Sequence, residues 1–264
     1  MKCAAGSALT YTEVMLSEAV AENFTYKAAR WVVAIAASLA ITGCANMDTY
    51  RKAYPDPNER LGHLLALYKI NLKEGDGCHE IRRPPHETLD CTRLIAELDR
   101  LVMEFPNHKD VLMANAVLSY KAQRKEVAQL MLDRLLAQPG AHPEAAILRA
   151  RIALEQGNVI GAVQLLERQA MLAPSNLDLR SALASAYYTQ GDYERARNLL
   201  MTPGMANHDP PAHSYHLGLI AEAQEDWRAA CDHYRRAVGF APEFAPARAR
   251  IIGLARYIPC AADR

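Results

Sequence analysis

Residues 143–176 read PEAAILRARIALEQGNVIGAVQLLERQAMLAPSN, and this stretch is one unit of a 34-residue repeat that predicts the fold. Windows of the same length that begin at Lys109, Leu177 and Pro211 align with this stretch without a gap. The eighth position of each window is small, at Ala116, Ala150, Ala184 and Gly218. The twentieth position is alanine throughout, at Ala128, Ala162, Ala196 and Ala230. The twenty-fourth position is large, at Leu132, Leu166, Leu200 and Tyr234.

The two small positions predict two closely packed antiparallel helices in each window. A small residue on the first helix that faces an alanine on the second lets the helices approach, and the large residue one turn later fills the space beside them. Turns between the helices are marked by Gln156-Gly157-Asn158 and Gln190-Gly191-Asp192. The pattern resembles the tetratricopeptide repeat. This resemblance implies an all-α fold, a right-handed α-α superhelix with four repeats over residues 109–244.

Two copies depart from the pattern. The copy that begins at Leu177 contains Pro203-Gly204, so its second helix should stop near Met201 and an irregular connection should follow over residues 202–211. The copy that begins at Lys109 lacks the glycine between its helices and has Asn115 where a large apolar residue is usual. We therefore expect this copy to be the looser member.

The repeats are flanked by further helices. Residues 58–108 carry two apolar helical stripes and read as a degenerate N-terminal helical hairpin, with a long connecting loop from Glu74 to His86. Residues 245–264 read as a capping helix and tail, with Arg248, Arg250 and Arg256 expected to face solvent.

The N-terminal region has the features of an export signal. Lys27 and Arg30 precede an apolar run that ends in Ile41-Thr42-Gly43-Cys44. Those four residues resemble the lipobox of bacterial lipoproteins, which makes residues 1–43 a signal peptide, Cys44 the lipid attachment site and residues 44–57 a tether. Residues 1–26 are too acidic for an export signal, which favours a misassigned start. An uncleaved anchor and a buried helix are the alternatives.

The resemblance also implies a location. Ala45 stands where an aspartate would retain a lipoprotein at the inner membrane, so in a diderm bacterium we expect an outer-membrane lipoprotein that faces the periplasm. The chain carries 30 basic and 30 acidic residues, and it stays formally neutral after residues 1–43 are removed. A neutral chain gives no reason to expect nucleic acid as a partner.

The cysteines other than Cys44 in the mature region are even in number, at Cys78, Cys91, Cys231 and Cys260. In an exported protein this favours disulfides, and Cys78–Cys91 with Cys231–Cys260 is the local pairing among three. Four buried thiols are the alternative.

Motifs for metal binding and catalysis are missing from the sequence. Cys78, His79, His86 and Cys91 lack the spacing of a zinc site, and His213 and His216 read as surface or groove histidines. We find no nucleophile elbow, phosphate-binding loop or zinc-protease helix. The sequence therefore predicts neither an enzyme nor a bound cofactor or metal.

The candidate site is the concave face of the repeats. In the family this face is lined by the second, fifth, ninth, twelfth and thirteenth positions of each first helix. Transferred to this chain, the strongest candidates are Met113, Val117, Tyr120, Lys121, Ile147, Arg151, Leu154, Glu155, Ser185, Tyr188, Tyr215, Leu219 and Glu222. Their mixture of aromatic, aliphatic and charged side chains suits an extended or helical peptide. Alternatively, some of the tyrosines only pack between helices.

Signal and repeats together predict a lipid-anchored adaptor that binds an envelope protein or peptide. It resembles tetratricopeptide lipoproteins that assist type IV pilus assembly or dock peptidoglycan hydrolases. One alternative is a passive structural subunit of an outer-membrane or secretion complex that uses its convex surface. Another is an enzyme with a site in the Glu74–His86 loop.

Overall fold

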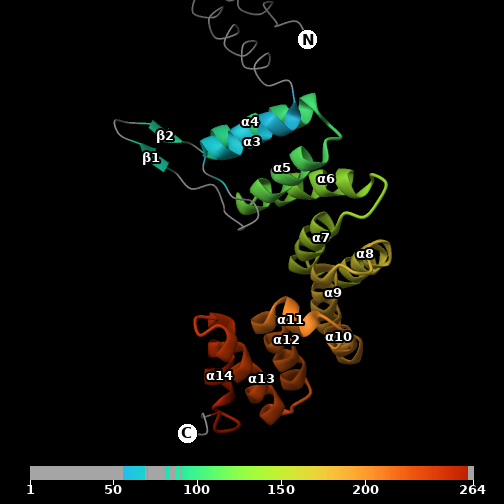
Figure 1. Ribbon diagram of the computed structural model, residues 1–264, viewed down its shortest axis with the longest axis vertical. Helices are drawn as coiled ribbons and strands as arrows, with labels where there is room; N and C mark the ends of the chain where they lie inside the picture. The colour runs from blue at the N-terminus through green and yellow to red at the C-terminus, as the bar shows by residue number, and fades with distance from the viewer. Residues whose placement is uncertain (1–55, 69, 71–80, 84–86, 90, 261–264) are drawn as a thin grey trace, which may run out of the picture. The chain divides into compact units, whose positions relative to one another are not determined.

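The computed structural model describes residues 56–68, 70, 81–83, 87–89 and 91–260 (Figure 1). The chain forms two compact units, Met1–Arg60 and Leu61–Arg264, and nearly all described residues belong to the second. The predicted signal peptide, the lipid attachment site at Cys44 and Cys78 lie outside the described residues, as does the side chain of Cys91.

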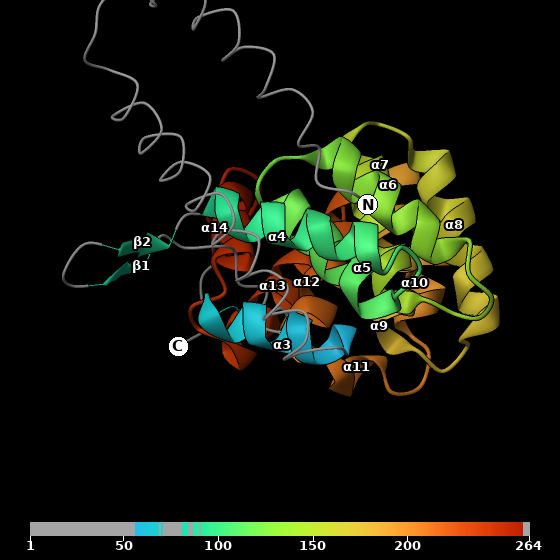
Figure 2. The same ribbon diagram turned by 90° about the horizontal axis from the view of Figure 1, so that it is seen from above.

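The fold is all-α, as the sequence predicted, and the second unit is an α-solenoid of stacked helical hairpins. The N-terminal hairpin and first two repeats contain α3 (Pro57–Leu67), α4 (Cys91–Glu104), α5 (Lys109–Lys121), α6 (Lys125–Leu136), α7 (Pro143–Glu155) and α8 (Val159–Leu172). The remainder contains α9 (Leu177–Gln190), α10 (Tyr193–Leu200), α11 (Met205–His208), α12 (Pro210–Ala223), α13 (Trp227–Phe240) and α14 (Ala245–Leu254). Helices consecutive along the chain pack together, for example α4 with α5 and α5 with α6 (Figure 2).

Two short strands lie in and beside the stretch that the sequence predicted as a long connecting loop, Glu74 to His86. They are β1 (Ile81–Arg83) and β2 (Glu87–Leu89), and they pair antiparallel with Ile81 opposite Leu89. Nothing in the sequence indicated these strands. Runs of three residues are too short for the alternating pattern that identifies a strand.

The small positions of the repeats lie between the helices, as the packing argument requires. All eight are buried, and the four alanines of the second helices are fully so. Gly218 shows why the last copy differs, because a Cβ placed on it would lie 2.5 Å from Cε1 of Tyr234. Of the four copies, the last thus has the smallest residue at the eighth position and the largest at the twenty-fourth.

The turns between paired helices share one backbone conformation. Gly157 and Gly191 have φ of 78° and 87°, in the left-handed region that glycine adopts without steric cost. Gln123 and Glu225 occupy the equivalent position in the other two copies, each with φ of 61°. The stacking of the helices therefore imposes the turn even where the sequence lacks glycine.

The residue after this position caps the second helix in three copies. The side chains of Asn158, Asp192 and Asp226 accept hydrogen bonds from the backbone N–H three residues later. Arg124 takes this place in the first copy and provides no such cap.

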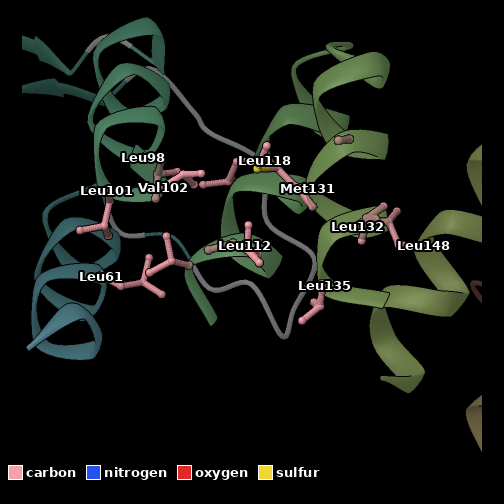
Figure 3. Close-up of a cluster of buried hydrophobic side chains, with 14 of the residues drawn as sticks. Leu61, Leu98, Leu101, Val102, Leu112, Leu118, Met131, Leu132, Leu135 and Leu148 are labelled. Carbon is pink, nitrogen blue, oxygen red and sulfur yellow. The ribbon is translucent and has the colours of Figure 1, made fainter. Parts of the chain in front are cut away.

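The core is continuous through the N-terminal hairpin and first repeats. Figure 3 shows Leu61 from α3 and Leu101 from α4 among side chains that continue through α5 and α6 to Leu148 of α7. Asn115 of α5 is only 1% exposed, but its polar atoms are satisfied. Its Nδ2 donates to Asp99 Oδ1 at 2.9 Å, and Ser119 Oγ donates to its Oδ1 at 3.1 Å. The polar residue therefore links the first repeat to α4.

The connection after α10 is more ordered than the sequence predicted. The helix ends at Leu200, with Met201 as its C-cap, which agrees with the stop expected from Pro203-Gly204. The following residues were expected to be irregular over 202–211, but they include the one-turn helix α11 and lead into α12 at Pro210. Met205 explains the order, because its buried side chain packs into the core shared by the middle repeats.

The C-terminal cap is fastened to α13 at two points. A disulfide joins Cys231 of α13 to Cys260, with Cα atoms 5.8 Å apart. The rings of Trp227 and Tyr257 stack with centroids 4.4 Å apart and an interplanar angle of 6°. In the part of the chain that the structure describes, no helix has the length and hydropathy to span a membrane.

Candidate functional site

The predicted binding residues occupy the first helices of the repeats, α5, α7, α9 and α12. Helix α7 packs against α9, and α9 packs against α12, which brings successive first helices side by side. None of these residues is fully buried. Lys121, Arg151 and Glu155 are exposed, and the rest are partly exposed. All of them are thus open to solvent on one series of helices, which we call the first-helix face.

A hydrogen-bonded network crosses the N-terminal part of this face. The Tyr120 hydroxyl of α5 donates to Glu155 of α7, and Lys125 Nζ of α6 donates to the other carboxylate oxygen at 2.6 Å. The hydrogen bond from Lys125, followed by that from Tyr120, lowers the pKa of Glu155. Arg151 lies near this network but forms no ion pair with any described residue. Its positive charge nevertheless contributes to the lowered pKa of Glu155.

Aromatic rings gather at the C-terminal part of the face. Tyr215 of α12 lies 5.7 Å from Tyr234 and 5.5 Å from Phe244, measured between ring centroids. Tyr188 of α9 lies 5.7 Å from Tyr193 of α10. Burial raises the pKa of Tyr188, and its electrostatic neighbours include Tyr193 and Tyr215. Tyr188 and Tyr215 therefore pack against neighbouring aromatic rings and also remain partly exposed.

An ion pair lies beside these aromatic rings. Arg250 Nη1 of α14 donates to Glu222 Oε1 of α12 at 3.0 Å, and the Tyr234 hydroxyl donates to the other oxygen of the same carboxylate. Burial, reinforced by Glu222, raises the pKa of Tyr234 and keeps its hydroxyl protonated. Arg250 is exposed, as the sequence predicted, and it also forms this ion pair, which the sequence did not predict.

Three histidines lie close to α12. His216 Nε2 is 3.5 Å from Ser185 Oγ of α9, and His233 Nδ1 is 3.2 Å from an Arg236 nitrogen on α13. Burial lowers the pKa of His213, His216 and His233, and for His213 and His233 the nearby positive charge of Arg236 lowers it further. Within the described ranges, no group of three histidine, cysteine or acidic side chains could hold a metal ion.

Sequence reasoning missed Phe244 and Arg250 as parts of this face. Both lie after the last full helix pair, and the period gives no signal for them. A fifth window would begin at Ala245 and would place Ile252 at the small position, where the structure leaves it 75% exposed. The cap therefore does not repeat the packing of the other first helices, although it contributes to the same face.

Two open depressions lie elsewhere on the described surface. One, of about 510 Å³, is formed by residues 190–195 and Gln224. The other, of about 630 Å³, lies between α6, α7 and α8 and is lined partly by Leu136, Leu165 and Arg168. Neither includes any of the predicted binding residues.

Comparison with known proteins gives the family. Profiles of the tetratricopeptide repeat match residues 113–176 and 153–217. No curated protein matches the sequence.

The solved structures with a similar fold include tetratricopeptide repeat proteins, and their sequence identity to this chain is low. TTC0263 of Thermus thermophilus has a TM-score of 0.53 and 15% identity, over 63% of this chain and 91% of that one. MamA has a TM-score of 0.50 and 16% identity, over 59% and 91% of the two chains. A human IFIT1 dimer with m7Gppp-AAAA has a TM-score of 0.50 and 19% identity, over 63% and 41%. The paired helices, the buried small positions and the matched profiles together show that residues 113–217 of this chain are tetratricopeptide repeats.

Proposed function

We propose that this protein is a lipid-anchored adaptor of the cell envelope that binds a segment of another protein through its first-helix face. The family assignment indicates a protein-interaction scaffold. The observation that carries the proposal is the first-helix face itself, where partly exposed aromatic, aliphatic and charged side chains follow one another over successive helices. Tyrosine and arginine are the residue types that most often dominate binding at protein interfaces.

The chemistry of the face favours a peptide segment over a nucleic acid. Binding to a phosphate backbone needs a row of free cations. On this face the charge of Arg151 acts on Glu155, and Arg250 forms an ion pair with Glu222. A neutral, mixed surface instead suits a segment that presents both apolar and polar side chains.

The anchor is proposed from the sequence. Ile41-Thr42-Gly43-Cys44 would direct lipid attachment to Cys44, and Ala45 would leave the protein at the outer membrane, facing the periplasm. The processes that we propose for it are type IV pilus assembly and the docking of peptidoglycan enzymes. Labelling with a palmitate analogue tests the anchor, since Cys44→Ser should abolish the label and release the protein from membranes.

Crosslinking and affinity capture from solubilised envelope test the binding role. Arg151→Glu on the face is compared with Arg168→Glu, a matched charge reversal of an exposed arginine on the second helix α8. We expect a partner that Arg151→Glu releases and Arg168→Glu retains. Equal recovery with both variants would contradict binding through this face.

A second candidate, a structural subunit that uses the opposite surface, is favoured by one observation. Several large apolar side chains on the second helices are exposed, among them Leu130, Ile160 and Leu172 at 56–64%. If this candidate is correct, Ile160→Asp should disrupt assembly of the complex in which the protein resides, and Arg151→Glu should leave it intact.

A further inference from the structure

The cap helix extends the first-helix face beyond the last repeat. Phe244, which precedes α14, places its ring edge-on to Tyr215 at 5.5 Å, and Arg250 of α14 pairs with Glu222 at 3.0 Å. Tyr234 of α13 donates to the same carboxylate, and the electrostatic neighbours of Tyr188 on α9 include Arg250, Glu222 and Tyr215. Side chains from α9, α12, α13 and α14 therefore lie near one another at this end of the face.

The aromatic part of this cluster remains partly exposed. We define the aromatic patch as Tyr188, Tyr215, Leu219 and Phe244, each of which is neither buried nor fully exposed. Tyr215 contacts its aromatic neighbours at 5.5–5.7 Å with tilted or edge-on rings, the geometry that aromatic pairs prefer. Rings held in this way keep solvent-facing surface that a further ring or a branched aliphatic side chain can cover.

The charges beside the patch are already neutralised. Glu222 accepts hydrogen bonds from both Arg250 and Tyr234, so both of its oxygens are engaged. A charged side chain that entered the patch would lose its hydration without gaining a free counter-charge, which is unfavourable. Arg151, two repeats away along the chain, is by contrast unpaired within the described part of the molecule. The two ends of the face thus differ in the chemistry that they can receive.

We propose that the aromatic patch receives an uncharged aromatic or large aliphatic side chain of the bound segment, and that the cap helix is part of the binding site. The proposal rests on the proposed function, because it names the chemistry recognised at one end of the same face. Tyrosine suits this task because its ring supplies contact area and its hydroxyl can donate to the backbone of the segment.

The Cys231–Cys260 disulfide gives the cap a role in this site. The two cysteines are 29 residues apart in the sequence, and the segment between them contains both Phe244 and Arg250. The link restricts how far the cap can move from α13, so it keeps these two side chains on the face. Cys260→Ser should therefore weaken binding at the patch even where the repeats stay folded.

The test uses the purified full chain in detergent and a displayed library of random dodecapeptides. Selected peptides are synthesised with a fluorophore, and their Kd is measured by fluorescence polarisation. We expect an aromatic or large aliphatic residue to be enriched at one position. Tyr188→Ala and Phe244→Ala should each weaken binding by at least about tenfold, which corresponds to about 1.4 kcal/mol. Tyr188→Phe should retain most of the affinity.

Phe240→Ala is the matched control, because Phe240 lies at the end of α13 and is 61% exposed outside the patch. It should change Kd less than about twofold, and circular dichroism should show that every variant keeps its helices. Peptides that lose affinity with Arg151→Glu but not with the patch variants would overturn this inference and leave the proposed function standing. Peptides that are insensitive to all of these changes would overturn both.

Discussion

The packing of Gly218 against Tyr234 allows a quantitative test of the repeat geometry. Gly218→Ala would place a Cβ 2.5 Å from Cε1 and 2.6 Å from Cδ1 of Tyr234, whereas ordinary contacts of a Cβ lie at 3.4–4 Å. The ring has little freedom to move, because Tyr234 is fully buried and its hydroxyl is bonded to Glu222. Overpacking of this kind costs about 1–3 kcal/mol.

Helix propensity opposes this cost. Replacing glycine by alanine inside a helix contributes about 0.8–1.0 kcal/mol. We therefore expect Gly218→Ala to lower the free energy of unfolding by about 1 kcal/mol in net terms. In the background of Tyr234→Leu, which recreates the alanine–leucine pair of the other copies, the same change should raise it by about 1 kcal/mol. The difference between the two backgrounds isolates the steric contact.

The assay is hydrogen exchange of the amides of α12 and α13, since repeat proteins need not unfold in one step. Gly239→Ala is the control, because a Cβ added to Gly239 in α13 would meet nothing within 4 Å. The control should raise protection in both backgrounds. If Gly218→Ala stabilised the protein as Gly239→Ala does, whether Tyr234 or leucine is present, the packing argument would be refuted.

Three further predictions concern the turns, the histidines and the cap. Gln123→Gly and Glu225→Gly should each raise the free energy of unfolding in urea by up to about 1 kcal/mol. Both positions hold the left-handed backbone conformation, which costs residues other than glycine about 1–2 kcal/mol. No gain in stability would show that this backbone strain is absent. Stability should fall as the pH drops below about 6.5, because His213, His216 and His233 have pKa values lowered by burial and the unfolded chain therefore binds their protons first. This stability is fully present above pH 6.5 and is lost as the pH falls through the folded pKa values; His216→Gln should flatten the profile, and an unchanged profile would contradict the assignment. Reduction of Cys231–Cys260 should destabilise the cap by about 2–4 kcal/mol, seen as faster exchange in α14 with α7 unaffected; equal exchange in oxidised and reduced protein would argue against this role.

The placement of the candidate site could be predicted only in part. The positions taken from the family all fall on the first helices, since a residue's place in the period fixes which side of a helix it occupies. The period placed Tyr188 and Tyr215 on first helices in this way. Phe244 and Arg250 were not, because they follow the last repeat and reach the face through the particular angle at which the cap packs.

The helical hairpins follow from the amino-acid pattern alone, as do their period of 34 residues and the early end of α10 at Leu200. These features depend on contacts between residues at fixed, short separations, which a repeating pattern records directly. Three other features are visible only in the folded chain: Gln123 and Glu225 adopt a glycine-like turn, Tyr234 fills the space left by Gly218, and Arg250 pairs with Glu222. Each of these depends on how neighbouring helices stack. The stacking imposes a local conformation or contact that the local sequence alone does not favour.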